Sequence, residues 1–271
     1  MKNSLLFLML LSLSLHAEEP TKSAPLDHFL RRIQAKSADP KSGGSIVIVA
    51  FGDSITMGAT SRGTIEPEAV YHARLKKLLE EKYPKAVFSV INSGIGGDNA
   101  EAGLARIDRD VIRYQPDLVL VAFGANGLGE SPARLSAYES FLHKIVAKIR
   151  GGTEADVMLL TTPFMATRDN GIPSASQKQQ LTELMKLQNT GVVKRFAETA
   201  KQVASAEGVA WANVYGAWEK QAAGGVDTTA LLANGLNHPT GAAQEIGARE
   251  VFAVIETAAK ATTAPVSSVT K

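Results

Sequence analysis

Five short apolar runs divide the chain, and most are followed by a longer segment with helical spacing. The first run is continuous and rich in β-branched residues, which is typical of a strand buried on both faces. The runs predict strands at Ile46–Phe51, Val87–Ile91, Leu118–Phe123, Val157–Thr161 and Val209–Val214.

The segments between these runs predict amphipathic helices. Ser131 and Pro132 mark one helix start, after which apolar residues recur at intervals of three and four. The helices are expected at Glu68–Tyr83, at Asn99–Tyr114, from Pro132 onward, at 176–206 with a break near Asn189–Gly191, and at about 241–259. Strands that alternate with helices indicate a parallel sheet covered on both faces. We therefore expect an α/β fold, a three-layer α/β/α sandwich around a five-stranded parallel sheet.

The start of the chain has the pattern of a secretory signal peptide. Lys2 precedes the apolar run Leu5–Leu11, and Ala17 stands before two glutamates. The run is shorter than the ~20 residues that a membrane span needs. We expect residues 1–17 to be a signal peptide, 18–44 an N-terminal extension, 45–260 the folded domain and 261–271 a disordered tail. The protein is then exported, to the periplasm or the medium, without stable membrane insertion.

Composition narrows the classes of function. The chain has no cysteine, which excludes a cysteine nucleophile, a cysteine-ligated zinc ion and a thiol switch. The net charge is only +2 and the basic residues are scattered, so nothing points to nucleic acid as a partner.

Four turns carry the candidate chemistry. Three are glycine-rich and follow the first three strands, at Gly52–Gly58, Asn92–Asn99 and Gly124–Gly127. The fourth, Asn234–Pro239, leads toward the last helix. Ligands of open parallel sheets bind outside the carboxyl ends of the strands, where the strand order reverses. We therefore expect the site at this edge of the sheet.

The side chains in these turns suit acyl transfer. Ser54 would stand at a strand end as the nucleophile, and His238 would take its proton. Negative charge that develops on a carbonyl oxygen needs fixed donors. The N–H groups of Ser54 and Gly97 and the side-chain amide of Asn126 are available. This chemistry needs neither a metal ion nor an organic cofactor.

Two carboxylates in the turns have simpler interpretations. Asp53 is expected to accept N–H groups of its own loop. Asp98 is expected to cap the helix that follows it.

The four turns resemble the sequence blocks of the SGNH hydrolases, also called GDSL esterases and lipases. The resembling segments are Gly52–Ser54 for the first block, Asn92–Asn99 with Gly103–Ile107 for the second, Gly124–Asn126 for the third, and His238–Pro239 for the last. Gly127 departs from the third block, where an aspartate usually follows the asparagine.

This resemblance covers roughly Ile46–Ala259. It implies the flavodoxin-like fold of that family for residues 45–260, and it implies a function for each site residue. Ser54 would be the nucleophile, His238 the base, and Ser54, Gly97 and Asn126 the oxyanion donors.

The usual catalytic acid is missing. The family usually has an aspartate three residues before the histidine, and Gly235 stands there. A backbone carbonyl near Gly235 could orient the His238 ring, Asn234 could do so, or the distant Asp227 could fold in; we favour the first two. Without a buried carboxylate the imidazolium is less stabilised. We therefore expect a slow enzyme or a shifted pH optimum, unless another acid is recruited.

Two other classes of function, nucleotide binding and sugar binding, are alternatives to ester hydrolysis. A nucleotide-binding protein is a poor alternative, because Asn99 occupies the place of the third glycine of the dinucleotide fingerprint. A catalytically weak sugar-binding module stays open because the acid is missing.

The segment Arg168–Gln180 is polar and shows no broad apolar lid. We therefore expect an exported serine esterase that removes small acyl groups, such as O-acetyl groups on carbohydrate, through an acyl-enzyme. A lipid-ester hydrolase is the alternative.

Overall fold

The computed structural model describes residues 25–61 and 64–263. The predicted signal peptide and the first part of the predicted extension lie outside the described residues, as does most of the predicted tail.

A parallel sheet forms the centre of the molecule. Its strands are β1 (Ile46–Gly52), β2 (Phe88–Gly94), β3 (Leu118–Ala122), β4 (Asp156–Leu160) and β5 (Ala210–Ala212). They lie in the order β2-β1-β3-β4-β5, which is the flavodoxin-like order, and every neighbouring pair is parallel. The predicted fold class is confirmed.

Strand β1 shows why the sheet needs helices on both faces. Val49 and Phe51 pack into one core cluster, whereas Ile48 and Ala50 pack into the other. All four side chains are fully buried. The continuous apolar run predicted this two-sided burial.

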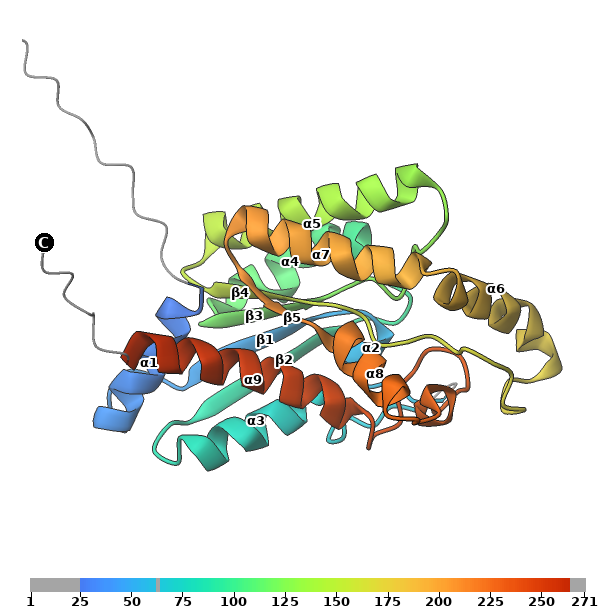
Figure 1. Cartoon of the computed structure of the whole chain (residues 1–271). Coiled ribbons are helices and arrows are strands. Elements are labelled where there is room, and N and C mark those ends of the chain that lie inside the picture. Colours follow the sequence, from blue (N-terminus) through green and yellow to red (C-terminus); the bar gives the residue numbers. More distant parts are fainter. Residues whose placement is uncertain (1–24, 62–63, 264–271) are drawn as a thin grey trace, which may run out of the picture.

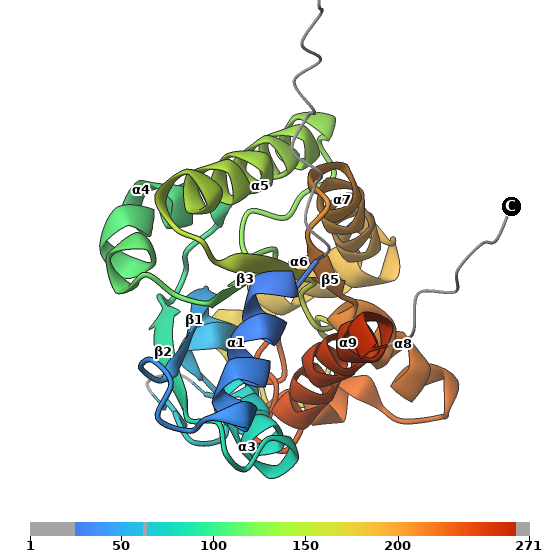
Figure 2. The same ribbon diagram turned by 90° about the vertical axis from the view of Figure 1, so that its left-hand side faces the viewer.

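Helices α4, α5 and α7 cover one face of the sheet, and α1, α3 and α9 cover the other (Figures 1 and 2). Helices α2, α6 and α8 lie toward the carboxyl ends of the strands (Figure 1). The bounds are α1 Asp27–Ala38, α2 Ser54–Met57, α3 Tyr71–Lys82, α4 Ala100–Asp110, α5 Pro132–Gly152, α6 Lys178–Asn189, α7 Val192–Glu207, α8 Val214–Ala223 and α9 Gln244–Thr263. Short 3₁₀ turns add Ile112–Tyr114, Ala175–Gln177 and Thr228–Leu231.

The helix boundaries refine the sequence prediction. The expected break near residue 190 is confirmed, because Gly191 adopts a left-handed conformation (φ 75°) between α6 and α7. The predicted fifth strand is too long at its end. Asn213 caps the unpredicted helix α8 there by accepting the Gly216 N–H.

The ends of the predicted domain also shift. Helix α1 lies in the predicted extension, yet Phe29 and Ile33 are buried against the sheet, so this helix is part of the domain core. Helix α9 continues to Thr263, so the first residues of the predicted tail are helical. Within the described part of the chain, no helix is both long and apolar enough to cross a membrane.

Candidate active site

Ser54 is the first residue of α2, directly after β1. The Asp53 side chain caps this short helix by accepting the Ile55 N–H at 2.9 Å. The helix lies close to the end of β2, where a Cβ on Gly94 would stand 2.2 Å from the Met57 nitrogen. A glycine at the end of β2 therefore allows the approach that holds Ser54 at the sheet edge.

Asp53 has the structural role expected for it. Its side chain is buried, and this burial raises the pKa of the carboxyl to about 7. Hydrogen bonds from the backbone N–H groups of Ile55 and Ala125 partly oppose this rise in pKa. Asp53 thus fixes the start of α2 and makes no hydrogen bond to the His238 ring within the described residues.

His238 faces the serine hydroxyl. Its Nε2 lies 2.9 Å from Ser54 Oγ, which is the distance of a hydrogen bond. Asn234 builds the turn that presents the ring, because its Oδ1 accepts the N–H groups of Leu236, Asn237 and His238. The predicted nucleophile and base, 184 residues apart in sequence, are therefore neighbours.

The other ring nitrogen of His238 lacks support. Nδ1 is buried and has no hydrogen-bond partner among the described residues. Burial of the ring lowers the pKa of His238 because it disfavours the charged imidazolium, and the Thr60 backbone partly opposes this shift. The neutral imidazole, the form that can accept a proton, thus persists to lower pH than in an exposed histidine.

Two of the three expected replacements for the acid make no hydrogen bond to the His238 ring among the described residues. Asn234 holds the backbone of the turn rather than the ring, because its Oδ1 accepts backbone N–H groups and its Nδ2 donates to Asn237 Oδ1. Asp227 is ion-paired with Arg168 and makes no hydrogen bond to His238 within the described residues.

The third expected replacement, a backbone carbonyl near Gly235, makes no hydrogen bond to Nδ1 either, since that atom has no partner among the described residues. The backbone of Thr60, in the loop after α2, acts on the ring only by partly opposing the fall in its pKa. Sequence spacing offered no signal for this residue, because its approach to the ring depends on how the two loops pack.

The position of the usual acid is physically filled. Gly235 adopts a left-handed backbone (φ 63°), and a Cβ there would lie 2.5 Å from Asn170 Oδ1 and 2.9 Å from Pro173 Cδ. A side chain at this position collides with the loop that contains Asn170 and Pro173, so a carboxylate does not fit without movement of that loop.

The predicted oxyanion donors lie at the same groove as the dyad. Ser54, Gly97, Asn126 and His238 all line one groove of about 600 Å³. Asn126 Nδ2 donates to the Asp98 carbonyl at 2.9 Å, which fixes the amide and leaves its second hydrogen for a ligand. The Gly97 N–H has no hydrogen-bond partner among the described residues.

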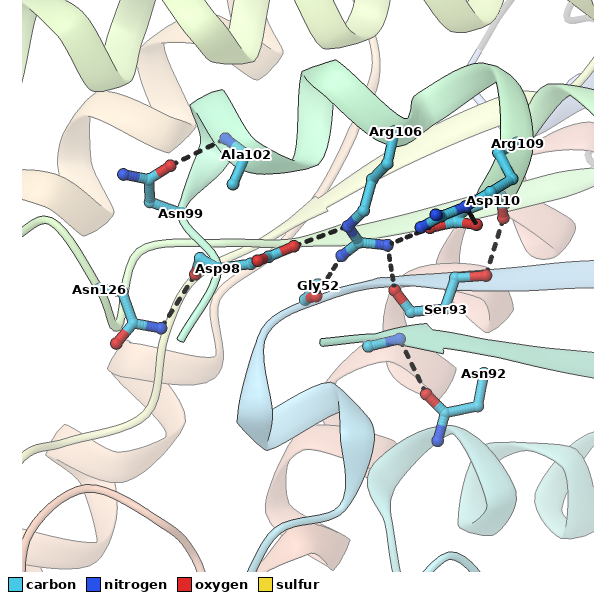
Figure 3. Close-up of polar contacts among 11 residues, drawn as sticks. Gly52, Asn92, Ser93, Asp98, Asn99, Ala102, Arg106, Arg109, Asp110 and Asn126 are labelled. Atoms are coloured by element: carbon cyan, nitrogen blue, oxygen red, sulfur yellow. Dashed lines mark hydrogen bonds and ion pairs between the residues drawn. The ribbon is translucent and has the colours of Figure 1, made fainter. Parts of the chain in front are cut away.

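Asp98 itself differs from its expected role. Asn99, not Asp98, caps α4, by accepting the Ala102 N–H at 2.9 Å. The Asp98 carboxylate instead pairs with Arg106 at 2.6 Å (Figure 3). The sequence placed the cap one residue too early.

One part of the groove lining is polar. Ser176 and Gln177, in the 3₁₀ turn Ala175–Gln177, and Gln180, in α6, line the same groove as Asn237. Hydroxyl and amide groups can donate and accept hydrogen bonds to a polyol. Within residues 25–61 and 64–263, no three histidine, aspartate or glutamate side chains gather closely enough to hold a metal ion.

Comparisons with known proteins identify a family and several relatives. Residues 50–246 match the GDSL-like Lipase/Acylhydrolase family. An acetylxylan esterase of Geobacillus stearothermophilus is 27% identical over 164 residues, which cover 54% of this chain and 72% of that protein. An uncharacterized lipoprotein of Bacillus subtilis is 32% identical over 79 residues, which cover 29% of this chain and only 31% of that protein.

Solved structures show the same fold. The crystal structure of an acetylxylan esterase from Geobacillus stearothermophilus superimposes with a TM-score of 0.60 at 24% identity, over 79% of this chain and 96% of that one. A hydrolase from the metagenome of Lake Arreo, Spain, gives 0.59 at 22% identity, over 80% and 97%.

Variants of the acetylxylan esterase described as catalytic mutants replace a serine, a histidine and an aspartate three residues before that histidine. In this chain, glycine stands three residues before His238.

Proposed function

Because the chain belongs to the GDSL-like lipase/acylhydrolase family and is a serine esterase of the SGNH type, we propose that Ser54 and His238 form its catalytic dyad. We further propose that it removes small acyl groups, chiefly acetyl, from carbohydrate. The observation that carries the proposal is the 2.9 Å contact between Ser54 Oγ and His238 Nε2, at a groove also lined by Gly97 and Asn126.

Acylation begins with proton transfer. Neutral His238 accepts the hydroxyl proton at Nε2 while Ser54 Oγ attacks the carbonyl carbon of the ester. The carbonyl oxygen becomes an oxyanion, which receives hydrogen bonds from the Asn126 amide and the N–H groups of Gly97 and Ser54. The imidazolium then gives its proton to the departing alkoxide oxygen, so that an alcohol leaves and Ser54 carries the acyl group.

Deacylation repeats these steps with water. His238 accepts a proton from the water molecule, the hydroxide oxygen attacks the acyl-enzyme, and the same donors stabilise the second oxyanion. The proton returns to Ser54 Oγ as the carboxylic acid is released.

The dyad operates without a carboxylate. Nδ1 of His238 has no hydrogen-bond partner among the described residues, so the imidazolium gains no ionic partner there. In a triad the acid holds the ring and stabilises its charged form. Its absence supports the expectation of a slow enzyme.

Three features favour a sugar ester. The groove volume lies within the range of small-molecule sites. Its lining includes Ser176, Gln177 and Gln180, whose polar groups suit hydroxyl-rich ligands. One relative is named for acetylxylan, an acetylated polysaccharide. Met57 and Leu236 also line the groove, and they keep lipid esters as the second candidate.

Export is part of the proposal. The predicted signal peptide supports it, and one relative is described as a lipoprotein. Acetylated polysaccharide is an extracellular substrate, so the two proposals agree. N-terminal sequencing of the protein recovered outside the cytoplasm should give a start near Glu18.

The test is hydrolysis of p-nitrophenyl esters from acetyl to decanoyl, followed by acetate release from acetylated xylan. The wild type should prefer acetyl, and Ser54→Ala should lose activity by about 10⁴-fold or more. Ser136→Ala, at an exposed position on α5, is the matched control and should retain full activity.

A rate that rises with acyl-chain length would move the assignment to lipid esters. No Ser54-dependent turnover on any ester would favour the sugar-binding module.

A further inference from the structure

A single buried guanidinium joins the turns that form the site. Arg106 projects from α4, and its side chain is only 9% exposed. Nη2 donates to the Gly52 carbonyl and Nη1 to the Ser93 carbonyl, both at 2.9 Å. Nε donates to Asp98 Oδ2 at 2.6 Å, and Nη1 also reaches Asp110 Oδ2 at 2.9 Å (Figure 3). The carboxyl ends of β1 and β2 and the loop after β2 therefore share one cation.

The Arg106 guanidinium is connected through Asp98 to two of the proposed oxyanion donors. Asp98 follows Gly97 in sequence, so fixing its carboxylate also fixes the peptide that precedes it. The Asp98 carbonyl accepts the Asn126 amide at 2.9 Å, so the same residue orients the second donor (Figure 3). Gly52 stands two residues before Ser54 and pairs in register with Gly94.

We propose that Arg106 is a positioning residue for the oxyanion pocket. Through Asp98 it sets the Gly97 N–H and the Asn126 amide, and through Gly52 it sets their place relative to Ser54. This inference rests on the proposed serine-esterase mechanism.

The shape of arginine explains why another cation does not replace it. A guanidinium carries five N–H donors in a fixed planar fork, and here three of its nitrogens make four hydrogen bonds. A lysine has its donors on one atom and cannot reach Gly52, Ser93 and Asp98 together. The Arg106 guanidinium also lies 4.7 Å from the Phe51 ring centroid, which adds a cation–π contact.

Arg109 provides the contrast. It lies on the same helix and pairs with the same Asp110, but its side chain is 64% exposed. It makes no hydrogen bond to the loops of the site within the described residues. Both arginines carry a positive charge on α4, but only Arg106 contacts the loops of the site.

The experiment compares Arg106→Lys with the matched control Arg109→Lys. The fraction of competent enzyme is first counted by mass spectrometry after exhaustive labelling of Ser54 with a fluorophosphonate. The kcat and KM for p-nitrophenyl acetate are then expressed per labelled site. This correction removes any loss caused by misfolded protein.

Arg106→Lys should lower kcat per active site by about 10- to 100-fold while KM stays within about twofold. Misplaced donors weaken hydrogen bonds to the oxyanion, and these form mainly in the transition state. Affinity for a boronic acid analogue should fall by a similar factor. The pKa of His238 should not move, because the base is untouched. Arg109→Lys should match the wild type in every measurement.

A second variant covers the case in which Arg106→Lys does not fold. Asp98→Ala keeps Arg106 bound to Gly52, Ser93 and Asp110, but it cuts the link to the oxyanion loop. It should also lower kcat rather than raise KM.

Unchanged kcat per active site in both variants, with only a lower melting temperature, would overturn the inference and leave Arg106 as a purely structural residue. A wild type that hydrolyses no ester would instead remove the proposed function, and the inference with it.

Discussion

The two halves of the site are built differently. On the oxyanion side, Asn126 is anchored on the Asp98 carbonyl, and Asp98 is anchored on buried Arg106. On the base side, the His238 ring makes a hydrogen bond to Ser54, and its Nδ1 has no partner among the described residues. The place of the usual acid next to this ring is occupied by another loop, at Gly235.

The contrast separates two contributions to catalysis. Charge that develops on the substrate oxygen meets fixed donors, whereas charge that develops on the imidazole meets no carboxylate. Preorganised donors are usually the largest single source of rate enhancement in acyl transfer. We therefore expect this enzyme to depend more heavily on its oxyanion side than a triad enzyme does.

Among variants that keep Ser54 and His238, the largest effect should come from removing an oxyanion donor. Asn126→Ala should lower kcat for p-nitrophenyl acetate by about 100- to 1000-fold, with little change in KM, because the lost hydrogen bond is strongest in the transition state. Asn189→Ala is the control: this exposed asparagine at the end of α6 donates to the Thr167 carbonyl outside the groove, so its loss should leave kcat unchanged. A loss of less than tenfold would contradict the expected dependence on the oxyanion side, since the fixed donors would then contribute little to kcat.

A smaller effect, on stability, is expected from restoring the acid. Gly235→Asp should destabilise the fold by about 1–3 kcal/mol, because its side chain meets Asn170 and Pro173. It should not raise kcat/KM. Gly225→Asp has the same left-handed backbone (φ 83°) but open space around its Cβ, so it isolates backbone strain from collision.

Thermal unfolding and ester hydrolysis of both glycine variants test whether an aspartate at position 235 fits and whether it assists His238. Gly235→Asp should unfold at a lower temperature than Gly225→Asp. A tenfold rise in kcat/KM for Gly235→Asp would mean that the loop yields and the base side can be completed.

The smallest effect is expected at Asp227. Its carboxylate binds Arg168 at the surface, and it caps a 3₁₀ turn by accepting the Thr229 N–H. Asp227→Asn should therefore keep kcat/KM within about twofold of the wild type at every pH tested. A loss beyond tenfold would identify Asp227 as a recruited acid and remove the difference between the two halves.

The sequence predicted the fold and the reacting groups because both follow local rules. Short apolar runs, separated by segments with helical spacing, are sufficient to indicate a covered parallel sheet. Ser54 and His238 stand in turns whose position at the sheet edge follows from topology. Helix α8 was not predicted, because its start depends on the cap at Asn213 within an apolar run.

The support of the base could not be predicted in the same way. Asn170 packs against Gly235, which lies 65 residues later in the chain. The effect of the Thr60 backbone on the His238 ring likewise connects two loops that are far apart in sequence. Arg106 lies within a segment that the family resemblance covers, but its reach to Gly52 is a tertiary contact. Contacts of this kind depend on side-chain packing rather than on spacing.

The pKa of His238 itself shows most directly whether the base side of the site lacks a carboxylate. The Hε1 resonance of this residue can be assigned by its loss in His238→Asn and followed by NMR from pH 4 to pH 9. Burial without an ionic partner should place the pKa below the ordinary histidine value of about 6.5, so that the neutral base, and activity with it, persists as the pH falls toward that lower pKa. A pKa clearly above 6.5 would mean that a carboxylate stabilises the imidazolium, and it would contradict the account of an unsupported base side.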